Sequence, residues 1–377
     1  MTLAIQIVQF VLIISVLVIL HELGHFIPAK YFKTKVEKFY LFFDVKFSLF
    51  KKKIGETVYG IGWLPLGGYV KIAGMIDESM DTEQMKEEPK PWEFRSKPAW
   101  QRLIIMLGGV TVNFFLAWII YTLLLYSNGD TYIPADRIKY GIQVDSVGEK
   151  LGLRTGDKIV AVDGKKTKKF EDAMLDIILG DEVTVNRNGK ELTFLIPEEG
   201  IAEVLGAKGK RFLGVRQVAI IDSLIPGKPA LRAGIVPGDK VIAVNDGEVR
   251  YWDEFVDAVQ GKANQDITLL VERQGVQKQI DLTVRKDSTI GVGPYIEDIT
   301  TTDKFSLWGA IPAGFNETIN VLIKQVKQFK IIAKPKTGAY KQVKGPIGIV
   351  ELMSPTWDWT FFWGFMAMFS VWLAFLN

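Results

Sequence analysis

The sequence predicts a multi-domain membrane protein with an α-helical transmembrane core, a membrane-associated β-hairpin or sheet, and two small α+β modules. Three observations carry this prediction. Three apolar segments are each close to the roughly 20 residues that cross a bilayer as a helix. One stretch between the first two alternates apolar residues with glycines, and a later stretch contains an internal repeat.

The composition limits the chemistry of the chain. Its 377 residues are 48% hydrophobic and carry a formal net charge of only +3, which gives no indication of nucleic-acid binding. There is no cysteine, so disulfide bonds and thiolate metal sites are excluded, and any zinc must be held by histidine and carboxylate. The only two histidines in the chain are His21 and His25.

The three candidate spans are 1–32, 103–126 and 357–377. Residues 3–20 of the first span are almost continuously apolar. A cleaved signal peptide is an alternative for this span, but no basic residue precedes the apolar run and no small-residue cleavage site follows it. The third span ends together with the chain, and we expect the intact polypeptide to continue past Asn377.

Basic residues predict the orientation of the spans. Lysines are frequent in the loop 33–102, and no positive charge precedes the first span. Because basic loops stay on the cytoplasmic side, we expect this loop to be cytoplasmic. The segment 127–356 then lies on the other side of the membrane, in a periplasm or its equivalent.

The segment beyond the second span contains two copies of one supersecondary unit. GLRTGDKIVAVDG at 152–164 returns as GIVPGDKVIAVND at 234–246, and each copy continues into a helix and two further strands. We therefore predict one module at 127–200 and a second at 201–290. The connector 291–356 contains an amphipathic helix that lies either in the membrane interface or on an ordinary protein surface.

The first span contains the motif HELGH at 21–25. Residues four apart share one helix face, so His21 and His25 can reach the same metal ion. Glu22 stands beside them, where it can take a proton from water that the metal activates. An ionisable cluster in an apolar helix is costly and is therefore typical of a functional site.

A catalytic zinc ion needs a third protein ligand, and the residues of this chain do not identify it. A third histidine is absent, so the ligand must be a carboxylate. Asp44, Asp130 and Asp358 are the acids nearest to the spans, but none lies within an apolar run.

The chain resembles the site-2 protease family, in the branch of the bacterial regulator of sigma-E protease. The resemblance extends over essentially the whole chain and follows several motifs in order. Gly109 departs from it, since the family commonly has proline there. The matching residues are HELGH at 21–25, WLPLGGYV at 63–70 with Gly74, Phe94, Trp100 and Arg102 ahead of Gly108 and Asn113, and GPIGI at 345–349.

The resemblance implies a zinc metalloendopeptidase that uses Zn²⁺ and works within the membrane. The family continues its third span through Asn-x-x-Pro and Leu-Asp-Gly, whose Asp is the third zinc ligand. Asn377 corresponds to the first residue of that pattern, which assigns it to substrate binding. The implied substrates are single-span membrane proteins, such as anti-sigma factors or remnant signal peptides. The implied location is the bacterial inner membrane, with the active site towards the cytoplasm.

The resemblance also implies a membrane-reentrant β-sheet at about 44–74 and PDZ-like folds for the two modules. Such a sheet could hold an unwound substrate at a strand edge, and we assign Val58, Ile61 and Trp63 to this edge. The alternative is a plain cytoplasmic hairpin. The PDZ-like modules would bind peptide ligands or act as a size filter. The segment 213–215, Leu213-Gly214-Val215, resembles the carboxylate-binding loop of the second module.

Two other functions compete with the protease. A catalytically inactive membrane scaffold would bind partners through the tandem modules, but a degenerate relative would be expected to lose Glu22 or a histidine, and this chain keeps all three. A metal transporter would need ionisable residues in several spans. The second and third spans offer little beyond Asn113 and Asn377.

Overall fold

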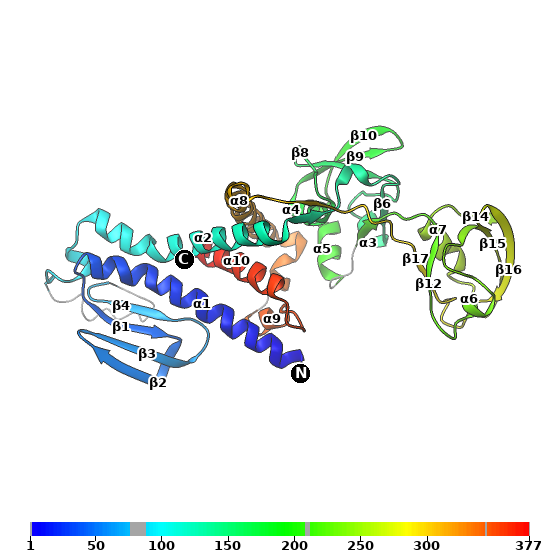
Figure 1. Cartoon of the computed structure of the whole chain (residues 1–377). Helices are drawn as coiled ribbons and strands as arrows, with labels where there is room; N and C mark the ends of the chain where they lie inside the picture. Colours follow the sequence, from blue (N-terminus) through cyan, green and yellow to red (C-terminus); the bar gives the residue numbers. More distant parts are fainter. Residues whose placement is uncertain (1, 76–87, 208–211, 344, 377) are drawn as a thin grey trace. The chain divides into compact units, whose positions relative to one another are not determined.

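The computed structural model describes residues 2–75, 88–207, 212–343 and 345–376. Two compact units are present (Figure 1). The first contains Met1–Asp130, Asp303–Phe329 and Val343–Asn377, and the second contains Thr131–Thr302 and Lys330–Gln342. Each unit is treated by itself below.

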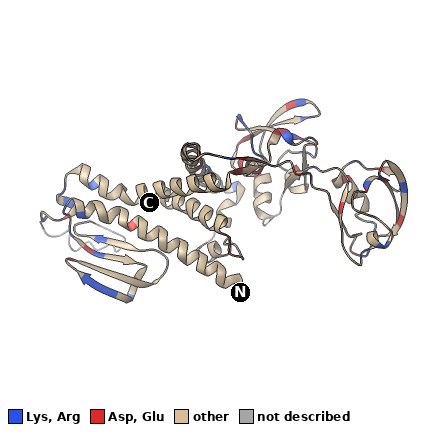
Figure 2. Ribbon diagram, in the orientation of Figure 1, with Lys and Arg blue, Asp and Glu red and all other residues tan. Residues whose placement is uncertain are grey.

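Three helices of the first unit are long and apolar enough to cross a membrane: α1 (Thr2–Tyr31), α2 (Ala99–Asn128) and α10 (Trp359–Leu376). The three predicted spans are thus long, apolar helices in the structure. Figure 2 shows few charged residues along them. α1 and α10 both pack against α2, and an apolar core between them includes Ile13, Leu17 and Met366. The unit also contains most of α8 (Leu307–Ile332) and the short α9 (Pro346–Val350).

A four-stranded sheet follows α1, in the order β2-β3-β1-β4. Its strands are β1 (Val36–Leu41), β2 (Phe43–Ile54), β3 (Thr57–Leu64) and β4 (Tyr69–Ile72). β2 and β3 form a hairpin that turns at Gly55, whose φ of +60° suits glycine. The inner end of the sheet packs on the helices through Val36, Val70 and Ile72.

The predicted free edge at 57–63 is wrong, because β3 lies inside the sheet. β3 pairs with β1 in parallel on one side and with β2 in antiparallel on the other, so its backbone groups are already bonded. The outer strands are β2 and β4. The side chains of Ile61 and Trp63 remain exposed, so their predicted contact with substrate stays a prediction.

The second unit contains two modules, each with its own apolar core. The first is a sheet in the order β10-β9-β7-β8 covered by α4 (Phe170–Leu179) and α5 (Glu198–Gly206). The second has the equivalent order β16-β15-β13-β14 and the helix α7 (Trp252–Val259). The strands are β7 (Lys158–Val162), β8 (Lys165–Lys166), β9 (Glu182–Arg187), β10 (Lys190–Leu195), β13 (Lys240–Val244), β14 (Gly247–Glu248), β15 (Asp266–Arg273) and β16 (Val276–Thr283).

Each module also has a separate two-stranded pair. β6 (Ile142–Val144) pairs with β11 (Leu213–Val215) in the first module, and β12 (Ile221–Leu224) pairs with β17 (Val292–Pro294) in the second. Phe212 and Leu213 are buried in the first core. The structure therefore places the segment 213–215 with the first module, whereas the sequence analysis assigned it to the second. The other α-helices and strands are α3 (Ser146–Glu149), α6 (Pro229–Arg232), β5 (Asp130–Tyr132) and β18 (Thr301–Asp303).

The Gly-Asp turn of the repeat is explained by a buried ion pair that occurs in both modules. Asp157 accepts two hydrogen bonds from Arg187, of 2.7 and 2.8 Å, and Asp239 accepts two from Arg273, of 2.6 and 2.7 Å. Each arginine also donates to a turn carbonyl, that of Gly152 or Gly234. The repeated aspartate therefore ties the turn to a neighbouring strand.

We expect Asp239→Asn to destabilise the second module by about 3 kcal/mol, because it breaks a buried, bidentate ion pair. Burial of Asp239 opposes its ionisation, but the hydrogen bonds from Arg273 and the Val236 amide outweigh this effect and lower its pKa. The stabilisation is therefore complete above the ordinary carboxyl pKa of 3.8 and is lost as the pH falls from there through the lower folded-state value. Hydrogen exchange of the β13 and β15 amides measures the effect. The exposed Asp246→Asn is the control, and equal protection in both variants would contradict the prediction.

Candidate functional site

The three residues of the HELGH motif that carry chemistry lie together on α1. The Nε2 atoms of His21 and His25 are 3.2 Å apart, and the two rings meet edge to face with centroids 4.9 Å apart. Glu22 is buried, with 8% of its surface exposed. The structure thus brings together the three residues that the motif singled out.

Two glycines allow α2 to approach this part of α1 closely. A Cβ atom at Gly24 would overlap the carbonyl of Gly108, and one at Gly108 would overlap the carbonyl of Gly24. Helices in a membrane use small residues in this way to bring their backbones together. The next residue, Gly109, lies against both imidazole rings, where any side chain would overlap them.

Groups on α2 orient the two rings. The Nδ1 atom of His25 lies 2.7 Å from the carbonyl oxygen of Ile105, which can only accept, so Nδ1 carries the proton and Nε2 keeps a free lone pair. The Nδ1 atom of His21 lies 3.0 Å from the side-chain amide of Asn113. Ile105, Gly109 and Asn113 are spaced by four residues and therefore share one face of α2.

Asn113 is completely buried, and its Oδ1 atom has no hydrogen-bond partner in the described part of the chain. A half-turn of the amide exchanges its oxygen and nitrogen, which places Oδ1 against Nδ1 of His21. In that orientation Nδ1 of His21 donates to Asn113, and its Nε2 atom has a free lone pair, as in His25. The backbone oxygen of Asn113 accepts a 2.8 Å hydrogen bond from Ser370 of α10, which fixes this position between helices.

A cavity of about 300 Å³ opens beside the motif. Its wall is mostly apolar and comes from α1, α9, α10 and the turn between β3 and β4. His21 and Glu22 form its polar part. The other lining residues are Phe10, Ile14, Val18, Phe43, Pro65, Leu66, Gly67, Gly68, Ile349, Phe369 and Leu373.

The remaining predicted site residues lie elsewhere. Val58, Ile61 and Trp63 are on β3, and the turn that follows them, not the strand itself, reaches the cavity. The segment 213–215 is in the second unit. Asn377 and the aspartate expected after it lie outside the described residues. Within the residues that are described, no group of three His, Cys, Asp or Glu side chains could hold a metal.

A histidine pair and a glutamate on an apolar helix, beside a cavity, define the class of a membrane metalloprotease. Residues 9–377 match the sequence profile of Peptidase family M50, and the chain belongs to this family of zinc metalloproteases. It is 26% identical to the regulator of sigma-E protease RseP of Escherichia coli over 98% of this chain and 86% of that protein. It is 28% identical, with the same coverage, to a Vibrio cholerae protein named "Putative zinc metalloprotease".

Proposed function

We propose that this chain is an intramembrane protease that hydrolyses peptide bonds in or next to the transmembrane segments of single-span proteins. The observation that carries the proposal is the position of the HELGH residues. They lie within a helix long enough to span the bilayer, and His21 and Glu22 face a mostly apolar cavity made with two more helices and a sheet turn. A peptide from a membrane-embedded substrate is the ligand that such a site would meet.

The histidine pair fits a zinc ion. Two imidazole nitrogens bound to one tetrahedral zinc at roughly 2.0–2.1 Å are about 3.3 Å apart. The Nε2 atoms of His21 and His25 are 3.2 Å apart. The Ile105 carbonyl leaves Nε2 of His25 free, and the Asn113 amide with its oxygen turned towards Nδ1 does the same for His21. His21, His25 and an aspartate beyond Asn377 would hold the ion, in agreement with the zinc metalloprotease names of the relatives.

The residues of the chain have separate roles in the reaction. Zinc, when bound, supplies the Lewis acidity that activates water and polarises the scissile carbonyl. Glu22 accepts the proton of the attacking water and returns it to the nitrogen of the leaving amine. Ile105 and Asn113 hold the two imidazoles in orientation. The apolar wall around Phe10, Phe43 and Phe369 limits bulk water at the reacting bond.

The proposal is tested by zinc content and cleavage together. We expect the intact, purified polypeptide to carry a single zinc ion and to cleave a model single-span substrate in lipid nanodiscs. A strong chelator should remove both the metal and the activity, and added zinc should restore them. A folded, intact protein with neither zinc nor cleavage would favour the scaffold function.

We expect Asn113→Leu to lower zinc affinity by about 10- to 100-fold, because it removes the group that orients His21. Asn113→Asp should restore most of the affinity, since a carboxylate oxygen also accepts a hydrogen bond from Nδ1. Competition with a metal-binding dye measures the affinity. Asn128→Leu, at the exposed end of the same helix, is the matched control. Wild-type affinity in Asn113→Leu would exclude the orienting role.

The two modules of the second unit are proposed to be PDZ-like and to bind peptides. A hollow of about 560 Å³ in the second module lies between α7 and the segment that leads into β17, and Trp252, Phe255 and Val259 form its apolar wall. Residues 292–294 there correspond to 213–215 in the first module, since β17 and β11 pair in the same way with β12 and β6. Residues 290–292 line the hollow where the chain enters β17, and we propose that they bind the end of a peptide in the second module.

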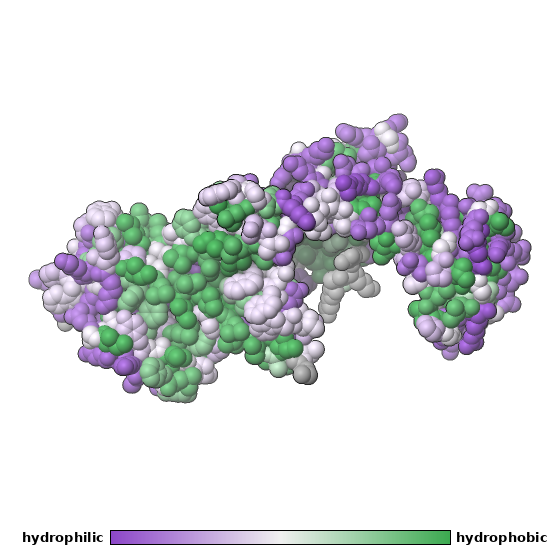
Figure 3. Space-filling view, viewed as in Figure 1, coloured by the Kyte–Doolittle hydropathy of each residue, from purple (hydrophilic) through white to green (hydrophobic). Residues whose placement is uncertain are grey.

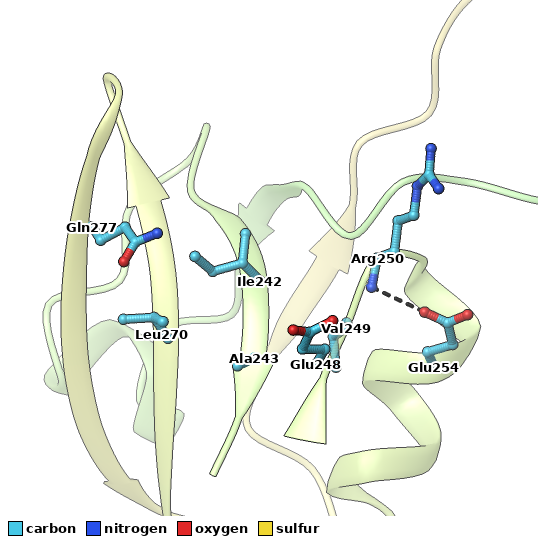
Figure 4. A pocket seen from close by; sticks show the side chains of 8 residues that line it. All are labelled: Ile242, Ala243, Glu248, Val249, Arg250, Glu254, Leu270 and Gln277. Atoms are coloured by element: carbon cyan, nitrogen blue, oxygen red, sulfur yellow. Dashed lines mark hydrogen bonds between the residues drawn. The ribbon is translucent and has the colours of Figure 1, made fainter. Parts of the chain in front are cut away.

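A second hollow of the same module is assigned no ligand. It lies on β13, β14, β15 and β16 beside α7 (Figure 4), and its two acids are Glu248 and Glu254. Glu254 already accepts hydrogen bonds from the backbone of Arg250 and Tyr251 and from the guanidinium of Arg216. Its carboxylate thus caps the start of α7 and also binds Arg216, in the segment that leads into the second module.

The proposed location is the bacterial inner membrane, with the catalytic helix end towards the cytoplasm and the two modules in the periplasm. The support is the excess of lysine in the loop 33–102 and the similarity to RseP. In that orientation the modules meet the outer domain of a substrate before its transmembrane segment reaches Glu22. We therefore expect the preferred substrates to be proteins whose outer domain has already been removed, such as cleaved anti-sigma factors.

A further inference from the structure

The equivalent helices of the two modules, α4 and α7, differ on one face. Each helix begins at the same distance after its copy of the repeated Gly-Asp segment, so their residues can be compared one by one. Leu175 and Ile178 of α4 correspond to Asp257 and Gln260 in the second module. Asp257 and Gln260 are exposed, whereas Leu175 and Ile178 are half-buried. An apolar helix face is typical of a helix that another element covers.

The second module is open at this place. Its hollow of about 560 Å³ lies between α7 and the segment that leads into β17, and Gln260 is part of its wall. Figure 3 shows hydrophobic residues on the surface of this module, at the far right of the view. The corresponding place in the first module lies between α4 and β11. A segment from much later in the chain, residues 330–342, belongs to the same compact unit as the two modules.

Residues 330–342 are part of the apolar core of the first module. The side chains of Ile331 and Ala339 are 3% and 7% exposed. Both belong to the same cluster of buried residues as Ile177 of α4 and Leu213 of β11. The segment therefore adds apolar side chains to a core that α4 and β11 also form.

Ion pairs place this segment at the end of α4. The Nζ atom of Lys334 lies 3.0 Å from Asp181, which follows the end of α4 by two residues. The same Nζ atom lies 3.5 Å from Glu198, the first residue of α5, and Lys330 pairs with Asp181 as well. Such partly exposed pairs contribute little energy, so most of the stabilisation comes from the buried apolar side chains. The segment thus connects the end of α4 with the start of α5.

The segment has a fixed shape of its own. The hydroxyl of Thr337 is buried and donates to the carbonyl oxygens of Ile331, at 3.0 Å, and Lys334, at 2.8 Å. Two short 3-10 helices follow each other at Pro335–Thr337 and Ala339–Gln342, and the first packs against α5. A preformed turn loses less conformational entropy on docking than a flexible peptide does.

We propose that residues 330–342 are an intramolecular ligand that fills the peptide groove of the first module, so that only the second module is open to the ends of substrates. This inference rests on the proposed peptide-binding role of the two modules. Covalent attachment gives such a ligand an effective concentration on the order of millimolar, and a peptide from solution must compete with it. The two modules therefore have different roles, although their folds are equivalent.

Cover of the groove is tested by thiol reactivity, because the chain contains no native cysteine. In the full chain in nanodiscs, Ile178→Cys should react with a charged maleimide at least ten-fold more slowly than Gln260→Cys. Adding Ile331→Asn, which places a polar group in the apolar core, should raise the rate at position 178 at least ten-fold and leave the rate at position 260 unchanged. An unchanged rate at position 178 would overturn the proposal.

Val185→Cys controls for unfolding of the first module, because Val185 of β9 is 0% exposed. Its thiol should stay unreactive when Ile331→Asn is present, so that faster reaction at position 178 reports release of the segment alone. Ala339→Glu should release the segment in the same way. If the thiols at 178 and 185 both become reactive in each release variant, the segment is an obligatory part of the fold and not a ligand, and the proposal fails.

Occupation of a peptide groove is tested with a fluorescent synthetic peptide of residues 330–342. Measured by fluorescence anisotropy, the full chain with Ile331→Asn should bind this peptide at least ten-fold more tightly than wild type, whose own segment competes. A peptide that carries the same change should not bind. Equal affinity of both proteins, or no binding by either, would overturn the intramolecular ligand. Neither measurement depends on zinc or cleavage, so this failure would leave the proposed protease activity untouched.

Discussion

Glu22→Gln is expected to reduce cleavage of a single-span substrate by about a thousand-fold or more, while the protein keeps its zinc. Glutamine has nearly the same shape as glutamate but cannot accept the proton of the attacking water, and general-base catalysis is typically worth 10²- to 10⁴-fold. Both histidines and their partners on α2 are untouched by the change. Zinc content and single-turnover cleavage, measured on the same preparation, separate the loss of the base from the loss of the metal.

The control for this prediction is Glu317→Gln on α8, a carboxyl group that does not line the cavity beside His21. It should cleave at the wild-type rate. If Glu22→Gln cleaves the substrate at a rate within ten-fold of wild type, the general base is another residue. Loss of zinc in Glu22→Gln would instead show that Glu22 helps to build the metal site.

Gly108→Ala is expected to lower activity by about 100-fold or more and zinc affinity by at least ten-fold. The added methyl group would overlap the backbone of Gly24, so α1 and α2 must separate. Separation moves the Ile105 carbonyl away from His25, and small displacements of catalytic groups cost rates of this size. Gly24→Ala should reproduce the effect from the other helix.

Gly364→Ala of α10 is the matched control, because a Cβ atom there meets only one side-chain carbon, at 4.0 Å. It should retain zinc and activity. Thermal unfolding of each variant shows whether the protein remains folded. A folded Gly108→Ala with full zinc affinity would mean that the helices can separate without moving the imidazoles.

The spans and the metal-binding motif could be predicted because both depend on short sequence patterns. Apolar runs of the right length predict membrane helices, and the spacing of His21 and His25 places them on one helix face. The contribution of α2 was harder to predict. Asn113 was identified through a resemblance and as one of the few polar residues of the spans, but not as a partner of His21. The four-residue spacing of Ile105, Gly109 and Asn113 was available as a signal.

The strand order could not be predicted, because it depends on contacts between distant residues. The pattern of 57–63 describes a strand with two faces, but it does not say that β2 covers one edge and β1 the other. The place of 213–215 was missed for the same reason. β11 pairs with β6, about 70 residues earlier, and the repeated motif at 152–164 contains neither strand.

The spacing of the three orienting residues on α2 has a consequence for how this sequence can vary. Ile105, Gly109 and Asn113 reach the imidazoles only because four residues make slightly more than one helical turn. Inserting or deleting one residue between them would rotate everything beyond it by about 100° around the helix axis. Asn113 would then face lipid or another helix, while Ile105 kept its place. Functional homologues should therefore differ in this stretch by substitution, and length changes should be confined to the loops on either side of α2.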